Sequence, residues 1–207
     1  MDHRPEYDPK KHHRHSTRLK AYDYSSEGVY HVVVRTKNGV CVFGKVVGNE
    51  MKLSPIGEIA QSFWLEIPQH FNNVRLDIFQ VMPNHIHGIL VLHEKPTAPV
   101  RVEYIQPIRG KKERAKNEFQ HVIPKSVGSI VRSFKAAVAR TSKKEGYLGF
   151  KWQRDFYDHI IRDGKDLDRI RRYILDNPAN WANDENLPDN IKMDRLHDGD
   201  ENWSALD

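Results

Sequence analysis

The order of the predicted elements indicates an α+β fold of the ferredoxin-like sandwich class, with an antiparallel sheet and helices packed on it. Four segments have strand character, and two amphipathic helices separate them in the order strand, helix, strand, strand, helix, strand. One additional helix follows the fourth strand. The 207 residues suit one such domain with extensions.

The first strand and helix have clear sequence signals. Residues 28–36 are dense in β-branched side chains, which predicts a strand buried on both faces. Residues 40–43 and 46–53 predict short strands around a Gly-Asn turn. A helix is expected from Ser54, an N-cap residue, with apolar side chains at helical spacing as far as Ile67.

The middle of the chain predicts a strand pair and then an irregular insertion. Residues 74–82 and 85–92 are expected to form antiparallel strands joined by a Pro-Asn turn. Residues 94–124 contain four prolines, little periodicity and many basic residues, which predicts a long basic loop.

The last third predicts a helix, a strand and the additional helix. A basic amphipathic helix is expected over residues 126–144, and an aromatic-rich fourth strand over residues 152–162. Asp166 is then expected to cap a helix over residues 167–177, which Pro178 would end.

Charge is distributed unevenly along the chain. Residues 1–20 predict a flexible basic arm, residues 21–182 the folded domain, and residues 183–207 an acidic tail. The tail has eight acidic residues and two basic ones, which leaves a net charge of +11 on the rest of a chain of net charge +5. A basic body indicates a polyanionic partner such as nucleic acid, although a solvated basic surface is an open alternative.

Composition excludes several classes of protein. Cys41 is the only cysteine, so neither a disulfide framework nor a cysteine-rich zinc site is possible. We expect no transmembrane helix, because no run of 18 apolar residues exists, and the polar N-terminus does not resemble a signal peptide. The expected location is the cytoplasm.

A His-x-His pair, His85 and His87, stands at the beginning of an apolar strand. Alternate residues of a strand project from the same face, so both imidazoles lie on one side about 7 Å apart along the strand and can converge on one metal ion. Two packed, hydrogen-bonded histidines are an equally simple interpretation.

The last helix offers a nucleophile and a third metal ligand. Tyr173 and Asn177 are four residues apart and therefore share one helix face. A tyrosine hydroxyl has a pKa near 10 and is a poor nucleophile unless a metal ion stabilises the developing charge. The amide oxygen of Asn177 would complete a hard ligand set for Mg²⁺ or Mn²⁺. A tyrosine at the edge of the core and an asparagine at a helix end remain open as alternatives.

Together these features resemble the HUH-type single-tyrosine transposases, particularly the REP-associated tyrosine transposases and their insertion-sequence relatives. The matching segments follow the family order from about residue 18 to residue 181. They are RLKAYDYS (18–25), VMPNHIHGIL (81–90), GSIVRSFK (128–135), WQRDFYDHIIR (152–162) and IRRYILDNP (170–178) with Trp181.

The resemblance implies cleavage and rejoining of single-stranded DNA that carries hairpin ends. His85, His87 and Asn177 would hold the metal ion, and Tyr173 would form a 5′-phosphotyrosine and release a 3′-hydroxyl. The basic arm, the insertion and the basic helix would contact DNA. The expected DNA-binding residues are Arg132, Lys135, Arg140, Arg109, Lys111 and Lys112. Relatives are dimers or monomers, and a nucleoid-associated protein is expected.

Three alternatives remain open at this point. Tyr157 is a rival nucleophile, although on a strand it has no ligand four residues later. A domesticated hairpin-binding protein would keep the fold without cleavage. A His-x-His phosphodiesterase would activate water and would not need Tyr173.

Overall fold

The computed structural model describes residues 22–93, 123–184, 186 and 187. The predicted N-terminal arm (1–20) lies outside the described residues. So do nearly all of the predicted insertion (94–124) and most of the predicted acidic tail (183–207).

Four antiparallel strands form the central sheet, in the spatial order β4-β5-β1-β6. They are β1 (Gly28–Arg35), β4 (Val74–Val81), β5 (His85–Leu92) and β6 (Tyr157–Ile161). Strand β1, the first in the chain, therefore lies inside the sheet, between β5 and β6. This topology and the helices packed on the sheet confirm the predicted α+β fold of the ferredoxin-like class.

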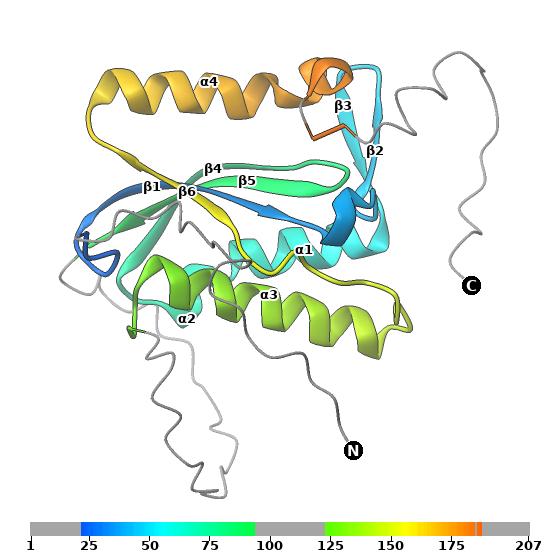
Figure 1. The fold of residues 1–207 in the computed structure, drawn as a ribbon, viewed down its shortest axis with the longest axis horizontal. Helices are drawn as coiled ribbons and strands as arrows, with labels where there is room; N and C mark the ends of the chain where they lie inside the picture. The colour runs from blue at the N-terminus through cyan, green and yellow to red at the C-terminus, as the bar shows by residue number, and fades with distance from the viewer. Residues whose placement is uncertain (1–21, 94–122, 185, 188–207) are drawn as a thin grey trace, which may run out of the picture.

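Helices cover both faces of this sheet (Figure 1). Helices α1 (Pro55–Leu65) and α3 (Val127–Lys144) lie on one face, and α4 (Gly164–Asn180) lies on the opposite face. The remaining elements are α2 (Ile67–His70), the β2–β3 hairpin (Gly44–Val47 and Glu50–Leu53), η1 (Lys37–Gly39) and η2 (Trp181–Asn183). Among the described residues, no helix has the length and apolar character needed to cross a membrane.

The larger core lies between the sheet and helices α1 and α3. Trp64 of α1 is fully buried there and packs edge-on against Phe134 of α3, with ring centroids 5.2 Å apart. Its indole occupies the space above Gly88 of β5: a Cβ on Gly88 would lie 2.1 Å from the ring. Glycine at this position therefore allows the indole to lie directly on the strand.

The fourth strand is shorter than the sequence predicted. Strand β6 begins at Tyr157, whereas Trp152 forms only an isolated bridge with Thr36. The Trp152 ring instead packs against Phe43 and Phe150, and its Nε1 donates a hydrogen bond to the Lys135 carbonyl. These ring contacts and the hydrogen bond to α3 hold this segment, which adds only the Trp152 bridge to the sheet.

Residues 40–43 also form no strand. The N–H of Phe43 donates to the carbonyl of Pro83, and the carbonyl of Phe43 accepts from the N–H of Ser54. These bonds tie the segment to two different parts of the chain, so it does not pair as a hairpin strand. The predicted Gly-Asn turn does connect two strands, β2 and β3. The Ser54 cap is also observed, although the helix ends at Leu65, before Ile67.

Helix α4 begins earlier and ends later than predicted. Its N-cap is Asp163, whose carboxylate accepts a hydrogen bond from the N–H of Asp166. Pro178 lies inside the last turn, where the missing N–H removes a single helical hydrogen bond. Burial of Pro178 and Trp181 accompanies this extension of the helix.

An ion pair fastens α4 to the edge strand β4. Arg171 donates to both carboxylate oxygens of Asp77, from Nε at 2.9 Å and from Nη2 at 2.7 Å. Such a two-point contact fixes the orientation of the guanidinium as well as its distance from the carboxylate. The arginine lowers the pKa of the Asp77 carboxyl below its ordinary value of 3.8.

Replacing Gly88 tests the close approach of Trp64 to the sheet. We expect Gly88→Ala to lower the free energy of unfolding by about 1–3 kcal/mol, because the added methyl group forces the indole out of its position. Denaturant unfolding monitored by tryptophan fluorescence measures the change. Gly164→Ala is the control, since a Cβ there meets no atom within 4 Å. Equal stability of the two variants would contradict the proposed packing.

Replacing Asp77 tests the attachment of α4. A carboxyl whose pKa is lowered by folding stabilises the protein above its ordinary pKa of 3.8, and this contribution disappears as the pH falls through the lower folded pKa. We therefore expect Asp77→Asn to be less stable than the unchanged chain at pH 6, with the difference shrinking below about pH 4. Urea unfolding at several pH values measures this.

Asp168→Asn is the matched control. Asp168 lies 3.5 Å from the same guanidinium, but its side chain is 67% exposed to solvent. We expect this variant to unfold like the unchanged chain at both pH values. A loss of stability as large as that of Asp77→Asn would show that the Asp77 contact does not hold α4 more strongly than the exposed Asp168 contact does.

Candidate functional site

The His-x-His pair lies at the beginning of β5, on the sheet face that α4 covers. His85 pairs with Arg35 and His87 with Val33 of the central strand β1. His85 is 0% exposed and His87 is 2% exposed. Their Nε2 atoms are 2.8 Å apart, so the two imidazoles converge on one point as the strand alternation predicted.

Burial keeps these imidazoles uncharged. Loss of solvent lowers the pKa of His85 to about 4, with a smaller lowering by the positive charge of Arg35 that Asp184 opposes. Desolvation lowers the pKa of His87 well below its ordinary value, and the neighbouring histidines add to the effect. Both side chains are therefore neutral at pH 7, the state in which a ring nitrogen can bind a metal ion.

Asn84 fixes the orientation of His85 from the preceding turn. Its Nδ2 donates to the carbonyl of Gly39 at 2.9 Å and to that of Asn186 at 2.7 Å. Its Oδ1 therefore remains as the acceptor and lies 2.7 Å from Nδ1 of His85. His85 carries its proton on Nδ1, and its Nε2 presents a lone pair toward His87.

Helix α4 crosses directly over the two histidines. Its apolar side chains Ile170 and Ile174 pack on Ile89 of β5 and hold the helix against the sheet. The Tyr173 ring lies edge-on to His87, with centroids 5.3 Å apart, and the Trp181 ring lies 6.0 Å from His85.

Asn177 lies between these two contacts on the same helix face. It is four residues after Tyr173 and four residues before Trp181, and it is 3% exposed. Its Oδ1 is buried and has no hydrogen-bond partner among the described residues. A buried amide oxygen without a partner is costly, which makes it a good candidate for a ligand of a cation.

These donors fit a divalent cation. Two neutral imidazole nitrogens and one amide oxygen form a nitrogen and oxygen set, which suits Mn²⁺ or Mg²⁺ better than a sulfur-preferring ion. Within the described part of the chain, no group of three His, Cys, Asp or Glu side chains could hold an ion together. The third ligand of such a site would therefore be Asn177, with other positions left for substrate oxygen atoms.

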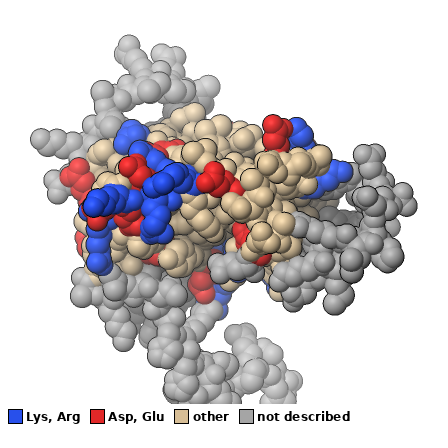
Figure 2. Space-filling model, turned by 90° about the horizontal axis from the view of Figure 1, so that it is seen from above, with Lys and Arg blue, Asp and Glu red and all other residues tan. Residues whose placement is uncertain are grey.

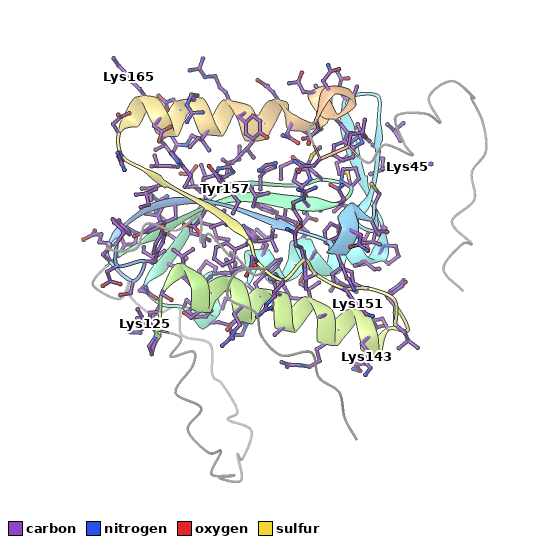
Figure 3. All side chains as sticks on the ribbon, viewed as in Figure 1. Lys45, Lys125, Lys143, Lys151, Tyr157 and Lys165 are labelled. Atoms are coloured by element: carbon purple, nitrogen blue, oxygen red, sulfur yellow. The ribbon has the colours of Figure 1, made fainter. Side chains whose placement is uncertain are left out.

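Tyr157, the rival nucleophile, lies near the same site. It is the first residue of β6, on the face that α4 covers (Figure 3), and its ring centroid lies 6.3 Å from that of His31. Tyr157 is 50% exposed and Tyr173 is 45% exposed, so exposure does not distinguish the two side chains. Tyr173 differs in its direct ring contact with His87.

The predicted DNA-binding residues on α3 lie on the other side of the sheet. Figure 3 labels Lys143 near the end of α3 and Lys165 at the beginning of α4, on opposite sides of the molecule. Arg132 and Arg140 are exposed on α3. The Lys135 ammonium instead donates to the carbonyls of Gln153, Arg154 and Asp155. The predicted contacts Arg109, Lys111 and Lys112 lie outside the described residues.

Helix α4 carries its own basic side chains. Figure 2, seen from the α4 side, shows Lys and Arg gathered toward the beginning of this helix with acidic side chains among them. The basic residues there include Lys165, Arg169 and Arg172. Asp166 pairs with Arg169, so the local charge is mixed.

Sequence reasoning missed three residues around the pair: His31, Asn84 and Arg35. His31 is 6% exposed, and its Nε2 lies 3.2 Å from Nδ1 of His87. Strand alternation places His31 on the same face as residues 29, 33 and 35, but only the pairing of β1 with β5 reveals its neighbour. Asn84 was interpreted only as a turn residue, so its contact with His85 was not predicted. The Nε of Arg35 is buried without a hydrogen-bond partner among the described residues.

Comparisons with known proteins give relatives in sequence and in fold. No protein-family model matches the chain. An uncharacterized protein of Haemophilus influenzae is 39% identical over 179 residues, which cover 84% of this chain and 93% of that protein. A provisionally named REP-associated tyrosine transposase of the same organism is 29% identical over 100 residues, covering 48% of this chain and 46% of that protein.

A solved structure has the same fold. It is that of a REP-associated tyrosine transposase bound to a REP hairpin, with a TM-score of 0.51, 16% sequence identity, and coverage of 93% of this chain and 98% of that one. The chain therefore belongs to one family with the uncharacterized Haemophilus protein, and its resemblance to the REP-associated tyrosine transposases is confirmed by a named relative in sequence and by a solved structure in fold.

Proposed function

We propose that this chain is a transposase that cleaves and rejoins single-stranded DNA through a covalent link to Tyr173. The observation that carries this proposal is the convergence of three groups. The Nε2 atoms of His85 and His87 are 2.8 Å apart, and the Tyr173 ring lies 5.3 Å from His87. The proposed nucleophile thus stands beside two nitrogens that could bind a metal ion, an arrangement that suits phosphoryl transfer.

His85, His87 and Asn177 would hold Mg²⁺ or Mn²⁺. Bound there, the ion would polarise a non-bridging oxygen of the scissile phosphate and stabilise the charge that develops on it. Burial under α4 excludes water from the two imidazoles, which strengthens this electrostatic effect. Arg35, which pairs with His85 across the sheet, offers a further donor for a phosphate oxygen through its buried Nε.

Tyr173 would attack the phosphorus atom with its phenolic oxygen. The bond from phosphorus to the 3′ oxygen breaks, and the proton lost by the phenol is balanced by the one that the leaving oxygen gains. One fragment of the strand then ends in a free 3′-hydroxyl, and the other carries the 5′-phosphotyrosine. Attack by a second 3′-hydroxyl reverses the chemistry and releases the tyrosine. The number of phosphoester bonds is unchanged throughout, so the reaction needs no nucleotide cofactor.

The proposed substrate is DNA with hairpin ends. The support is the solved relative of the same fold, which is bound to a REP hairpin. The Arg132 and Arg140 side chains on α3 would contact the phosphate backbone, with Arg109, Lys111 and Lys112 of the insertion. Because Lys135 donates to three carbonyls, we expect it mainly to hold residues 153–155 in place.

Covalent trapping tests the nucleophile. We expect the full chain with Mn²⁺ and a hairpin-bearing single strand to form an adduct that survives denaturing electrophoresis. A label at the 3′ end of the strand should stay with the protein, and the released fragment should carry a 3′-hydroxyl that a polymerase extends. Tyr173→Phe should form no adduct, and His85→Ala should lose it or greatly weaken it.

Tyr157→Phe is the matched control, since both tyrosines are about half exposed beside His31. It should form the adduct at the normal rate. Cleavage that persists in Tyr173→Phe would indicate a water nucleophile and a phosphodiesterase. Tight binding without cleavage by the unchanged chain would indicate a hairpin-binding protein.

The salt dependence of DNA binding tests the role of α3. Each phosphate contact contributes about 0.7–0.9 to the slope of log K against log salt concentration. We therefore expect the double variant Arg132→Gln, Arg140→Gln to bind DNA of any sequence more weakly, with a slope reduced by about 1.4–1.8. Fluorescence anisotropy with a labelled hairpin measures both quantities.

Lys135→Gln serves as the comparison for this prediction. We expect it to change the slope less, because its ammonium is held by protein carbonyls. An unchanged slope in the arginine double variant would show that DNA does not contact α3.

A further inference from the structure

His31 is a third buried imidazole beside the His-x-His pair, and the proposed chemistry gives it no task. It lies on β1 and stacks on His87, with ring centroids 5.4 Å apart and 18° between the planes. Its Nε2 faces Nδ1 of His87 at 3.2 Å, the nitrogen that points away from His85. His31 therefore contacts the side of His87 that faces away from His85, and it can influence metal binding only through His87.

The hydrogen-bond network determines the proton positions in the protein prepared without a divalent cation. Nε2 of His85 presents a lone pair, because its Nδ1 donates to Asn84. Nε2 of His87, 2.8 Å away, must then carry a proton and donate it to His85. This leaves a lone pair on Nδ1 of His87, so Nε2 of His31 must be the donor in the next bond.

Binding of a cation to both Nε2 atoms reverses this arrangement. Nε2 of His87 gives up its proton, and a neutral His87 must then carry the proton on Nδ1. That N–H points at Nε2 of His31, which has to become an acceptor. His31 therefore moves its own proton from Nε2 to Nδ1. Each imidazole stays neutral, and the number of protons on the two rings is unchanged.

We propose that His31 is a positioning residue that holds His87 in its metal-binding tautomer by accepting a hydrogen bond from Nδ1. This inference rests on the proposed function, because it takes His85 and His87 as metal ligands. It adds a requirement that the ligand set alone does not contain: a group behind His87 that can change from donor to acceptor. Partners of this kind commonly contribute 10-fold to 100-fold to metal affinity.

Metal affinity, measured without DNA, tests the role of His31. We expect His31→Phe, which keeps a stacked ring but has no acceptor, to bind Mn²⁺ about 10-fold to 100-fold more weakly by isothermal titration calorimetry. His31→Gln offers an amide oxygen to Nδ1–H and should restore most of the affinity. His159→Phe is the control: His159 pairs with His31 across the sheet but hydrogen-bonds Asp166 instead.

Nitrogen chemical shifts of the histidines give a readout that packing alone would not move. Titration of the full chain with diamagnetic Mg²⁺ should shift the proton of His31 from Nε2 to Nδ1, and that of His87 likewise. Folded His31→Phe that binds Mn²⁺ as tightly as the unchanged chain would overturn the proposal, as would a His31 tautomer that Mg²⁺ does not alter.

The result also separates this proposal from the one on which it rests. If the unchanged chain binds no Mn²⁺, both proposals fail. If it binds Mn²⁺ and forms the Tyr173 adduct while His31→Phe binds equally well, only the role of His31 fails.

Discussion

The burial of neutral imidazoles beneath α4 is the constraint on which the rest of this structure depends. Solvent is removed from His31, His85 and His87, and this lowers the pKa of His31 and of His85 to about 4. A buried polar ring needs a partner for each of its nitrogens. The network of Asn84, His85, His87 and His31 supplies partners for both ring nitrogens of His85 and of His87 in one continuous chain of contacts. A change of tautomer in one imidazole therefore changes which nitrogen of its neighbour must donate and which must accept a hydrogen bond.

The two faces of the sheet have different tasks. On the face toward α1 and α3, Trp64 and the alternate residues of β1 and β5 form a large and mainly apolar core. On the face toward α4, apolar contacts are fewer, because histidines take positions that a core would fill with isoleucine or valine. Stability therefore comes mainly from the first face. The second face can accept polar groups because the first supplies apolar burial.

Sequence reasoning predicted the topology, and it placed the residues of the proposed site on shared faces, for physical reasons. The strand and helix periods place His85 with His87, and Tyr173 with Asn177, without any knowledge of tertiary structure. What it missed depends on contacts between distant segments. Trp152 leaves the predicted strand because its ring packs against Phe43, which is far away in the chain, as well as against nearby Phe150. His31 meets His87 only through the register of β1 with β5.

The position of Tyr173 follows from two anchors of α4. In the middle of the helix, Arg171 forms an ion pair with Asp77 on the edge strand. Beyond its end, Trp181 and Leu187 pack on Met82, and the Asn186 carbonyl accepts a hydrogen bond from Asn84. Asn84 also holds His85, so the segment that follows the helix and the first histidine share one side chain. A displacement of the end of α4 would therefore disturb His85 as well, which ties the proposed nucleophile and ligands to one geometry.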